Sequence, residues 1–342
     1  MFSRFTLILR ILFVSVLFVI IKGCKEDDKK VVFELPSGVI YKIVCDKNGT
    51  KWIATDKGVV CYDGLEWNPY PDIPFENSFP VSDLNISSFT DNEIWIGGTQ
   101  GASYLKFSAS EILSSGNYSA QKNGLISDTI SSLAVDPLNN KYFGTSLGLS
   151  IYNNDNWTVF YGRDLEPILQ EYPIRAIATA KNGWIYAATY GGGVSRFKFA
   201  DAVSGATTYN SDWSGLRSDY VNTVIIVDDT CQWYGTNSGA AYHTSHLTKT
   251  LTDWNRVTSA DGLISDTVLS IAKDLNGNVW FGTSNGVSCL KNREIVNYTS
   301  TDGLVSNKVN TISVDIDGSI WFGTDHGLSH FINNTWKSYI PE

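Results

Sequence analysis

Short runs of alternating apolar and polar residues, each followed by turn-forming residues, recur along most of this 342-residue sequence. The last stretch shows the pattern clearly. Residues 309–314 (VNTISV) alternate in this way, which predicts a β-strand with one buried face. Residues 315–318 (DIDG) are typical of a turn, because Asp and Gly adopt the backbone conformations that tight turns require. Three more strands are expected at residues 319–324, 328–332 and 335–340.

The same arrangement occurs seven times. Each copy has an aromatic residue in its second expected strand and a glycine six residues later, and successive copies are 41 to 47 residues apart. Four short strands per repeat at this period are typical of a β-propeller blade. A single blade cannot bury both of its faces, so neighbouring blades must stack around an axis. The predicted fold is therefore all-β, a seven-bladed β-propeller of four-stranded antiparallel blades. The seven aromatic residues are Trp52, Trp95, Tyr142, Tyr186, Trp233, Trp280 and Trp321.

The repeat resembles a known family. Residues 277–283 (GNVWFGT) and 318–324 (GSIWFGT) are similar to the two-component regulator propeller repeat, which occurs in periplasmic sensor regions of bacterial hybrid histidine kinases. The resemblance extends from about residue 36 to the C-terminus. It is weaker in the second repeat, where Gly98 replaces Thr, and in the fourth, where residues 187–188 (AA) replace Phe-Gly. It implies a sensor-like domain. Because no kinase or receiver sequence follows the seventh repeat, we expect this chain to act without a kinase of its own.

The N-terminal segment is expected to direct export. Positively charged residues precede an apolar run at residues 11–21, which is too short to span a bilayer and is typical of a signal peptide. The run is followed by Gly23-Cys24, which resembles the cleavage site of a bacterial lipoprotein, although Lys22 stands where a small uncharged residue is usual. We expect residues 1–23 to be a lipoprotein signal peptide and Cys24 to carry lipid. The alternative is an ordinary signal peptide that is cut nearby.

Residues 24–35 are predicted to form an acidic tether with a lead-in strand, and residues 36–342 to form the propeller. The run at residues 25–30 (KEDDKK) resembles the signal that sends Bacteroidota lipoproteins to the outer face of the outer membrane. We therefore expect an outer-membrane lipoprotein, either surface-exposed or facing the periplasm. Residues 31–35 look like an extra outer strand. Strand 335–340 pairs locally and should complete the seventh blade, so the pairing of residues 31–35 stays open.

Composition excludes one class of partner and limits the role of the cysteines. Hydrophobic residues make up 43% of the chain and charged residues 18%, with a net charge of -9. Phosphate binding needs an excess of Lys and Arg on one face, so no nucleic-acid partner is expected. The remaining cysteines show no metal-ligand spacing. Cys45 and Cys61 fall on expected strands that are not adjacent, so we expect buried free thiols. The four cysteines are Cys45, Cys61, Cys231 and Cys289.

Few residues indicate chemistry. Asp128, Asp219 and Asp266 recur before the first strand of their blades. A ring of such carboxylates can hold a cation, but we favour the interpretation that they accept backbone N–H bonds. The expected topology separates the histidines from one another. We therefore expect no catalytic residue, no metal and no cofactor. The four histidines are His243, His246, His326 and His330.

Three classes of function are considered. The favoured one is a non-enzymatic, sensor-like propeller that binds a glycan or another small molecule. The first alternative is a propeller lyase resembling the streptogramin-inactivating lyases, which share similar blade motifs and need a histidine, acidic residues and a divalent metal on one face. The second alternative is a scaffold that binds a protein partner.

The expected ligand site lies where the repeat breaks down. Residues 164–172 (DLEPILQEY) replace the usual Asp-Gly-Leu-x-Ser-Asp connection into the fourth repeat, and residues 190–193 (YGGG) form an unusual turn in it. These connections share one face of a propeller, where aromatic rings with an arginine suit a sugar or an acidic ligand. The alternative is ordinary loop variation. The candidate ligand residues are Glu171, Tyr172, Tyr190, Arg217 and Tyr220.

Overall fold

In the computed structural model of the chain, the described residues contain twenty-eight β-strands, which form seven four-stranded antiparallel sheets. Each sheet is built from strands that follow one another in sequence, so each is one up-and-down blade. This confirms the predicted seven-bladed propeller. The structure describes residues 35, 38–69, 81–86, 93–108, 111–161, 172–199, 206–244 and 254–341.

Each blade contains four strands, which we call A to D in chain order. Blade 1 contains β1 (Ile40–Cys45), β2 (Lys51–Thr55), β3 (Gly58–Tyr62) and β4 (Trp67–Pro69), and blade 2 contains β5 (Val81–Ile86), β6 (Glu93–Gly98), β7 (Gly101–Ser108) and β8 (Glu111–Tyr118). Blade 3 contains β9 (Ile130–Val135), β10 (Lys141–Thr145), β11 (Gly148–Asn153) and β12 (Asn156–Tyr161), and blade 4 contains β13 (Ile174–Thr179), β14 (Trp184–Thr189), β15 (Val194–Lys198) and β16 (Thr207–Tyr209). Blade 5 contains β17 (Val221–Asp228), β18 (Cys231–Thr236), β19 (Gly239–His243) and β20 (Trp254–Val257). Blade 6 contains β21 (Val268–Lys273), β22 (Val279–Thr283), β23 (Gly286–Lys291) and β24 (Glu294–Tyr298), and blade 7 contains β25 (Val309–Val314), β26 (Ile320–Thr324), β27 (Leu328–Ile332) and β28 (Thr335–Tyr339).

Among the described residues, short helical turns follow strand D in three blades. They are α1 (Ala120–Asn123), η4 (Ser259–Asp261) and η5 (Ser300–Asp302). A capping box closes the start of η4 and of η5, which fixes how the chain leaves the outer strand. Within the described residues, no helix combines the length and the apolar character that crossing a bilayer requires.

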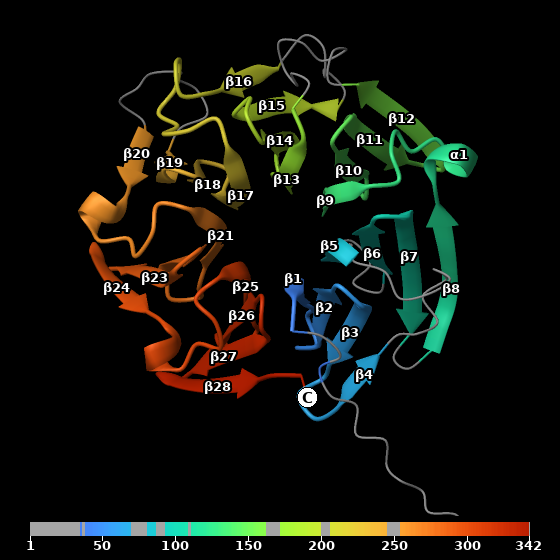
Figure 1. Cartoon of the computed structure of the whole chain (residues 1–342). Helices are drawn as coiled ribbons and strands as arrows, with labels where there is room; N and C mark the ends of the chain where they lie inside the picture. The colour runs from blue at the N-terminus through green and yellow to red at the C-terminus, as the bar shows by residue number, and fades with distance from the viewer. Residues whose placement is uncertain are drawn as a thin grey trace, which may run out of the picture. The chain divides into compact units, whose positions relative to one another are not determined.

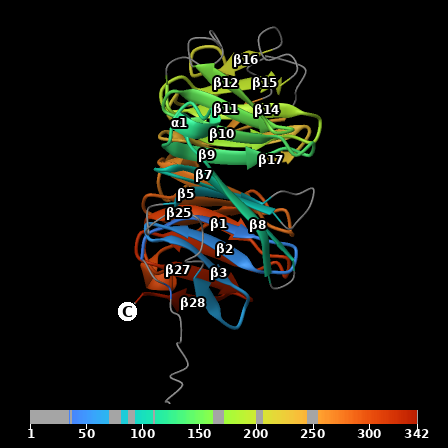
Figure 2. The ribbon, with the colours of Figure 1, turned by 90° about the vertical axis from the view of Figure 1, so that its right-hand side faces the viewer.

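The blades of the unit Phe33–Glu342 are arranged in a ring with strand A of each blade nearest the centre (Figure 1). Strand A of each blade contacts strand A of the next, and β25 of blade 7 contacts β1 of blade 1. Figure 2 shows the same neighbourhood from the side, with the blue first blade next to the red seventh blade. The ring is therefore closed by contact between the first and the last blade.

Apolar clusters between neighbouring blades form the core. In one of them, Trp95 of blade 2 packs with Ile130 and Phe143 of blade 3. The cluster between blades 7 and 1 contains Trp321 and Ile40. Leu35 is 3% exposed and belongs to this last cluster, so the lead-in segment ends at the ring closure. The pairing of residues 31–34 lies outside the described residues.

The repeated aspartate and aromatic residues hold the A–B turn. Asp136 accepts hydrogen bonds from the amides of Leu138 and Asn140, and from the Tyr142 hydroxyl at 2.8 Å. Asp46 with Trp52 and Asp274 with Trp280 make the equivalent contacts. These residues therefore stabilise the scaffold, as their presence in most repeats predicts.

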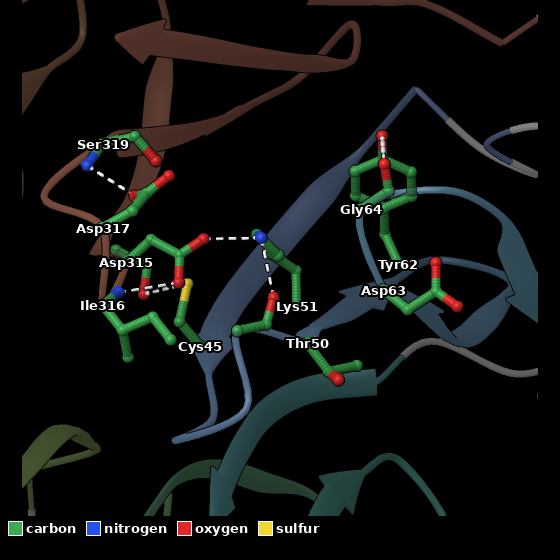
Figure 3. Close-up of polar contacts among 12 residues, drawn as sticks. Cys45, Thr50, Lys51, Tyr62, Asp63, Gly64, Asp315, Ile316, Asp317 and Ser319 are labelled. Carbon is green, nitrogen blue, oxygen red and sulfur yellow. Dashed lines mark hydrogen bonds and ion pairs between the residues drawn. The ribbon is translucent and has the colours of Figure 1, made fainter. Parts of the chain in front are cut away.

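The A–B turn of blade 7 differs because its aspartate contacts another blade. Asp315 Oδ2 lies 2.5 Å from Lys51 Nζ of blade 1, and the two side chains are 3% and 9% exposed (Figure 3). Lys51 also donates to the carbonyl of Gly49 at 2.7 Å and lies 5.2 Å above the Trp321 ring. A buried ion pair thus joins the first blade to the last.

The predicted strands of the seventh repeat match the structure to within one residue. The second and fourth strands are β26 and β28, each one residue shorter than expected. As expected, Cys45 on β1 and Cys61 on β3 are separated by β2, and none of the four cysteines forms a disulfide in the part of the chain that the structure describes. Cys61 and Cys289 are buried, whereas Cys45 and Cys231 are only partly buried. Desolvation raises the pKa of Cys45 and of Cys289 to about 12, so both are protonated thiols at neutral pH.

Candidate functional site

An irregularity at the start of every strand A shapes a central cavity. In all seven blades, the pairing of strand A with strand B skips the second residue of strand A. A bulge of this kind changes the direction of the skipped side chain. Together with their neighbours, the seven skipped residues line a central cavity of about 260 Å³. They are Tyr41, Ser82, Ser131, Arg175, Asn222, Leu269 and Asn310.

Four of the skipped residues connect adjacent blades. Each donates a side-chain hydrogen bond to the carbonyl of the first strand A residue in the next blade. The bond from Asn310 to Ile40, 3.0 Å long, joins blade 7 to blade 1. Blade 4 has Arg175 at this position instead, so the repeat is broken by a charged residue that lines the cavity. The four connecting residues are Ser82, Ser131, Asn222 and Asn310.

The cavity carries three charged side chains among its lining residues, of which two neutralise each other. Lys42 Nζ lies 3.1 Å from Asp83 Oδ1. Asp83 Oδ2 also accepts the backbone N–H of Leu133 at 2.7 Å, which fixes the carboxylate between blades 2 and 3. Arg175 forms no ion pair with any described residue. The formal charge of the lining is therefore +1 in a chain whose net charge is -9.

Arg175 is joined to two tyrosines at the border between blades 4 and 5. Its guanidinium carbon lies 4.7 Å above the ring of Tyr190, a cation–π contact. Tyr190 meets Tyr220 edge to face at 4.9 Å, and the backbones of the two tyrosines form an isolated bridge. The Tyr190 hydroxyl accepts a hydrogen bond from Asn237 at 3.4 Å. Asn237 in turn accepts from Asn222, which lines the cavity. We call Arg175, Tyr190, Tyr220 and Asn237, together with Tyr172, whose ring lies against the turn that follows Tyr190, the blade 4–5 cluster.

The B–C turn of blade 4 has one residue more than the others, and this extra residue makes room for Tyr172. In blade 7, the Thr324 hydroxyl donates a hydrogen bond to the carbonyl of Gly327, three residues later. In blade 4, the Thr189 hydroxyl donates to the carbonyl of Gly193, four residues later. A Cβ on Gly191 or on Gly192 would lie 2.7 or 2.6 Å from the Tyr172 ring. The glycines therefore let that ring lie against the turn. The Tyr172 side chain stays 38% exposed.

The structure brings together three of the five predicted ligand residues. Tyr172, Tyr190 and Tyr220 belong to the blade 4–5 cluster. Arg217 is exposed and makes no hydrogen bond or ion pair with a described residue, so the arginine of the cluster is Arg175 instead. Glu171 lies outside the described residues. Arg175 was missed because it lies within strand A and not in a connection where the repeat breaks down, although aligning the seven strand A segments shows it at a position that holds Ser or Asn in four other blades.

The repeated aspartates before strand A do not form a carboxylate ring. Asp128, Asp219 and Asp266 each accept the backbone N–H that begins the turn after the preceding strand D, at 2.6 to 2.7 Å. None of the three lines the central cavity. The structure therefore confirms the interpretation that they accept backbone hydrogen bonds, and no group of three or more potential metal ligands occurs in the described part of the chain.

The described histidines lie in three separate environments. His243 is buried at the end of β19, His326 is exposed in the B–C turn of blade 7, and His330 stacks on Trp321 in β27. His246 lies outside the described residues. The expected separation of the other three histidines is confirmed.

Comparison with known proteins identifies the repeat. Residues 262–285 and 303–326 match the family model of the two component regulator propeller. Both segments run from the D–A connection through strand B, in blades 6 and 7. This confirms the resemblance that the sequence indicates. No curated protein has significant sequence similarity to the chain.

Solved structures share the fold at low sequence identity. The extracellular domain of the putative one component system BT4673 from B. thetaiotaomicron is 20% identical, with a TM-score of 0.67 over 86% of this chain and 38% of that one. PorZ, a bacterial surface component of the type-IX secretion system of Porphyromonas gingivalis, is 15% identical, with a TM-score of 0.68 over 91% of this chain and 48% of that one. A streptogramin B lyase is 14% identical, with a TM-score of 0.64 over 90% of this chain and 95% of that one. This chain thus spans less than half of the BT4673 and PorZ chains.

Proposed function

We propose that this chain, whose sixth and seventh blades carry two component regulator propeller repeats, is an exported, sensor-like module that binds a sugar or an acidic small molecule without turning it over. One observation carries the proposal: the blade 4–5 cluster places a cation, three tyrosines and an amide beside a polar cavity. Aromatic faces with a few fixed polar groups are typical of small-ligand sites. The similarity to a propeller-containing extracellular domain of a putative one component system supports the sensor-like role.

A binding screen tests the proposal. The full-length chain is exposed to a glycan array and to a library of small metabolites, with thermal shift as the first readout and calorimetry as the second. The double variant Tyr190→Ala/Tyr220→Ala removes the edge-to-face pair and should weaken binding of any true ligand about tenfold or more. Leu138→Ala, an 80% exposed residue in the A–B turn of blade 3 on the opposite face, is the control and should bind normally. Full affinity in the double variant would place the ligand elsewhere.

The same screen separates the alternatives. A lyase would consume its ligand in a metal-dependent reaction, which product analysis of the incubated mixture detects. A scaffold would bind a protein partner and no compound in the library. The similarity to a streptogramin B lyase concerns the fold, and the described residues hold no group of three or more potential metal ligands, so binding without turnover is the reading we favour.

We also propose that the protein is an outer-membrane lipoprotein attached through Cys24, which lies outside the described residues. The short apolar run before Gly23-Cys24 and the similarity to an extracellular domain and to a bacterial surface component support this. Two acyl chains anchor a protein stably, whereas one does so only marginally. Cys24→Ala should therefore abolish fatty-acid labelling and release the protein from the membrane fraction. Cys61→Ala, which changes a buried thiol, should keep the label. Membrane retention of unlabelled Cys24→Ala would contradict the proposal.

A further inference from the structure

The chemistry of the central cavity restricts which ligand it accepts, provided that the proposed binding function holds. The connecting side chains have used all but one of their hydrogen-bond donors, the exception being the second N–H of the Asn310 amide. The hydroxyls of Ser82 and Ser131 donate to backbone carbonyls, and so do the side-chain amides of Asn222 and Asn310. Besides that N–H, what these four residues still offer is oxygen: two hydroxyl and two amide oxygens that can accept a hydrogen bond. A ligand that fits them must bring donors, and hydroxyl groups are such donors.

Arg175, by contrast, is a donor and favours a ligand group that accepts hydrogen bonds. It is the cavity's unneutralised charge, because Lys42 and Asp83 pair with each other. Its planar fork of N–H groups matches a carboxylate better than it matches a neutral group. The contact with Tyr190 orients the guanidinium without neutralising it, since the aromatic ring has no net charge. The lining therefore favours one anionic group beside Arg175 and hydroxyl groups elsewhere.

The size of the cavity limits the ligand further. Its volume of about 260 Å³ lies just below the range of roughly 300–1,000 Å³ that is usual for drug-sized ligands. One sugar ring fits this space, and the exposed rings of Tyr172 and Tyr220 beside it can contact whatever extends outward.

We propose that the central cavity binds a small hydroxylated carboxylate, of which a uronic acid is the simplest sugar form, with its carboxylate on Arg175 and its hydroxyls on the oxygen atoms of Ser82, Ser131, Asn222 and Asn310. The blade 4–5 cluster forms the border of this site. Arg175 is a residue that determines specificity.

Calorimetry with three probes tests this inference on the full-length chain in detergent. D-Glucuronate carries the carboxylate and the hydroxyls, D-glucose carries the hydroxyls alone, and acetate carries the carboxylate alone. Glucuronate should bind most tightly, and its affinity should fall as the salt concentration rises, because salt screens the charge on Arg175. Arg175→Gln should weaken glucuronate binding about 10- to 100-fold and leave the affinity for glucose unchanged. Arg175→Lys should show an intermediate loss, because lysine keeps the charge but not the fork.

Two arginine controls keep the result interpretable. Arg217→Gln removes an exposed arginine from the same face, and Arg293→Gln removes one from the C–D turn of blade 6 on the opposite face. Both should bind glucuronate as the unchanged protein does. Equal affinities for glucuronate and glucose, a normal affinity in Arg175→Gln, or equal binding of acetate would each overturn the inference, as would the absence of glucuronate binding. The broader binding proposal survives these outcomes if another ligand still depends on Tyr190 and Tyr220.

Discussion

His330 is a partly buried histidine in contact with the ring closure. Its imidazole stacks on Trp321 with ring centres 4.1 Å apart and planes 11° apart, and its buried Nε2 has no hydrogen-bond partner. Desolvation lowers the pKa of His330, and the nearby Lys51 and Lys337 lower it further, whereas Asp317 and Asp315 oppose the shift. The folded protein therefore resists protonation of this ring more than the unfolded chain does.

This resistance makes stability depend on pH. The unfolded chain takes up the proton near pH 6.5, the ordinary pKa of a histidine, and the folded protein takes it up only at lower pH. The contribution of His330 to stability is therefore complete above pH 6.5 and is lost as the pH falls toward its lowered pKa. His330→Phe keeps a ring on Trp321 but cannot titrate, so urea unfolding between pH 7 and pH 5 should show a smaller loss of stability. Leu138→Ala, at a side chain 80% exposed and without a titratable group, is the control and should keep the full loss. An unchanged slope in His330→Phe would contradict this account.

At the scale of single elements, the sequence predicts strands better than it predicts connections. Strand 309–314 follows from alternation, because its apolar residues pack against blade 6 whereas its polar residues contact blade 1. The turns η4 and η5 were not predicted, although the capping residues Thr258 with Asp261 and Thr299 with Asp302 are visible in the sequence. A Thr and an Asp three residues apart are common in polar loops. They indicate a capped turn only when the end of the preceding strand D is known.

The candidate site could likewise be predicted from the sequence only in part. Tyr172, Tyr190 and Tyr220 could be predicted, because they lie in connections where the repeat is broken. Arg217 lies in the same kind of break yet stays apart, since sequence position does not determine where a loop side chain points. Arg175 required knowledge of the bulge, which decides that the second residue of strand A lines the cavity. No motif in the sequence marks such a bulge.

At the scale of the whole molecule, the contacts that close the ring could not be predicted from local sequence patterns. Blades 1 and 7 are far apart in the chain, and three kinds of contact join them in the structure. These are the apolar cluster around Ile40 and Trp321, the hydrogen bond from Asn310 to Ile40, and the buried ion pair of Lys51 with Asp315. A similar lysine, Lys141, pairs with Glu93 at 3.3 Å between blades 3 and 2, which the chain already holds together.

The buried pair between Lys51 and Asp315 predicts a large loss of stability when one partner is removed (Figure 3). Lys51→Met leaves the Asp315 carboxylate, which is 3% exposed, without its cation, so the free energy of unfolding should fall by about 3–5 kcal/mol in urea denaturation. The double variant Lys51→Met/Asp315→Leu removes both charges and should recover most of that loss, because the desolvation cost disappears with the pair. Lys308→Met changes an exposed lysine of the same size and should stay within about 0.5 kcal/mol of the unchanged protein. If Lys51→Met behaved like Lys308→Met, the ion pair would contribute nothing to closure, and the apolar cluster between blades 7 and 1 would be what holds the ring shut.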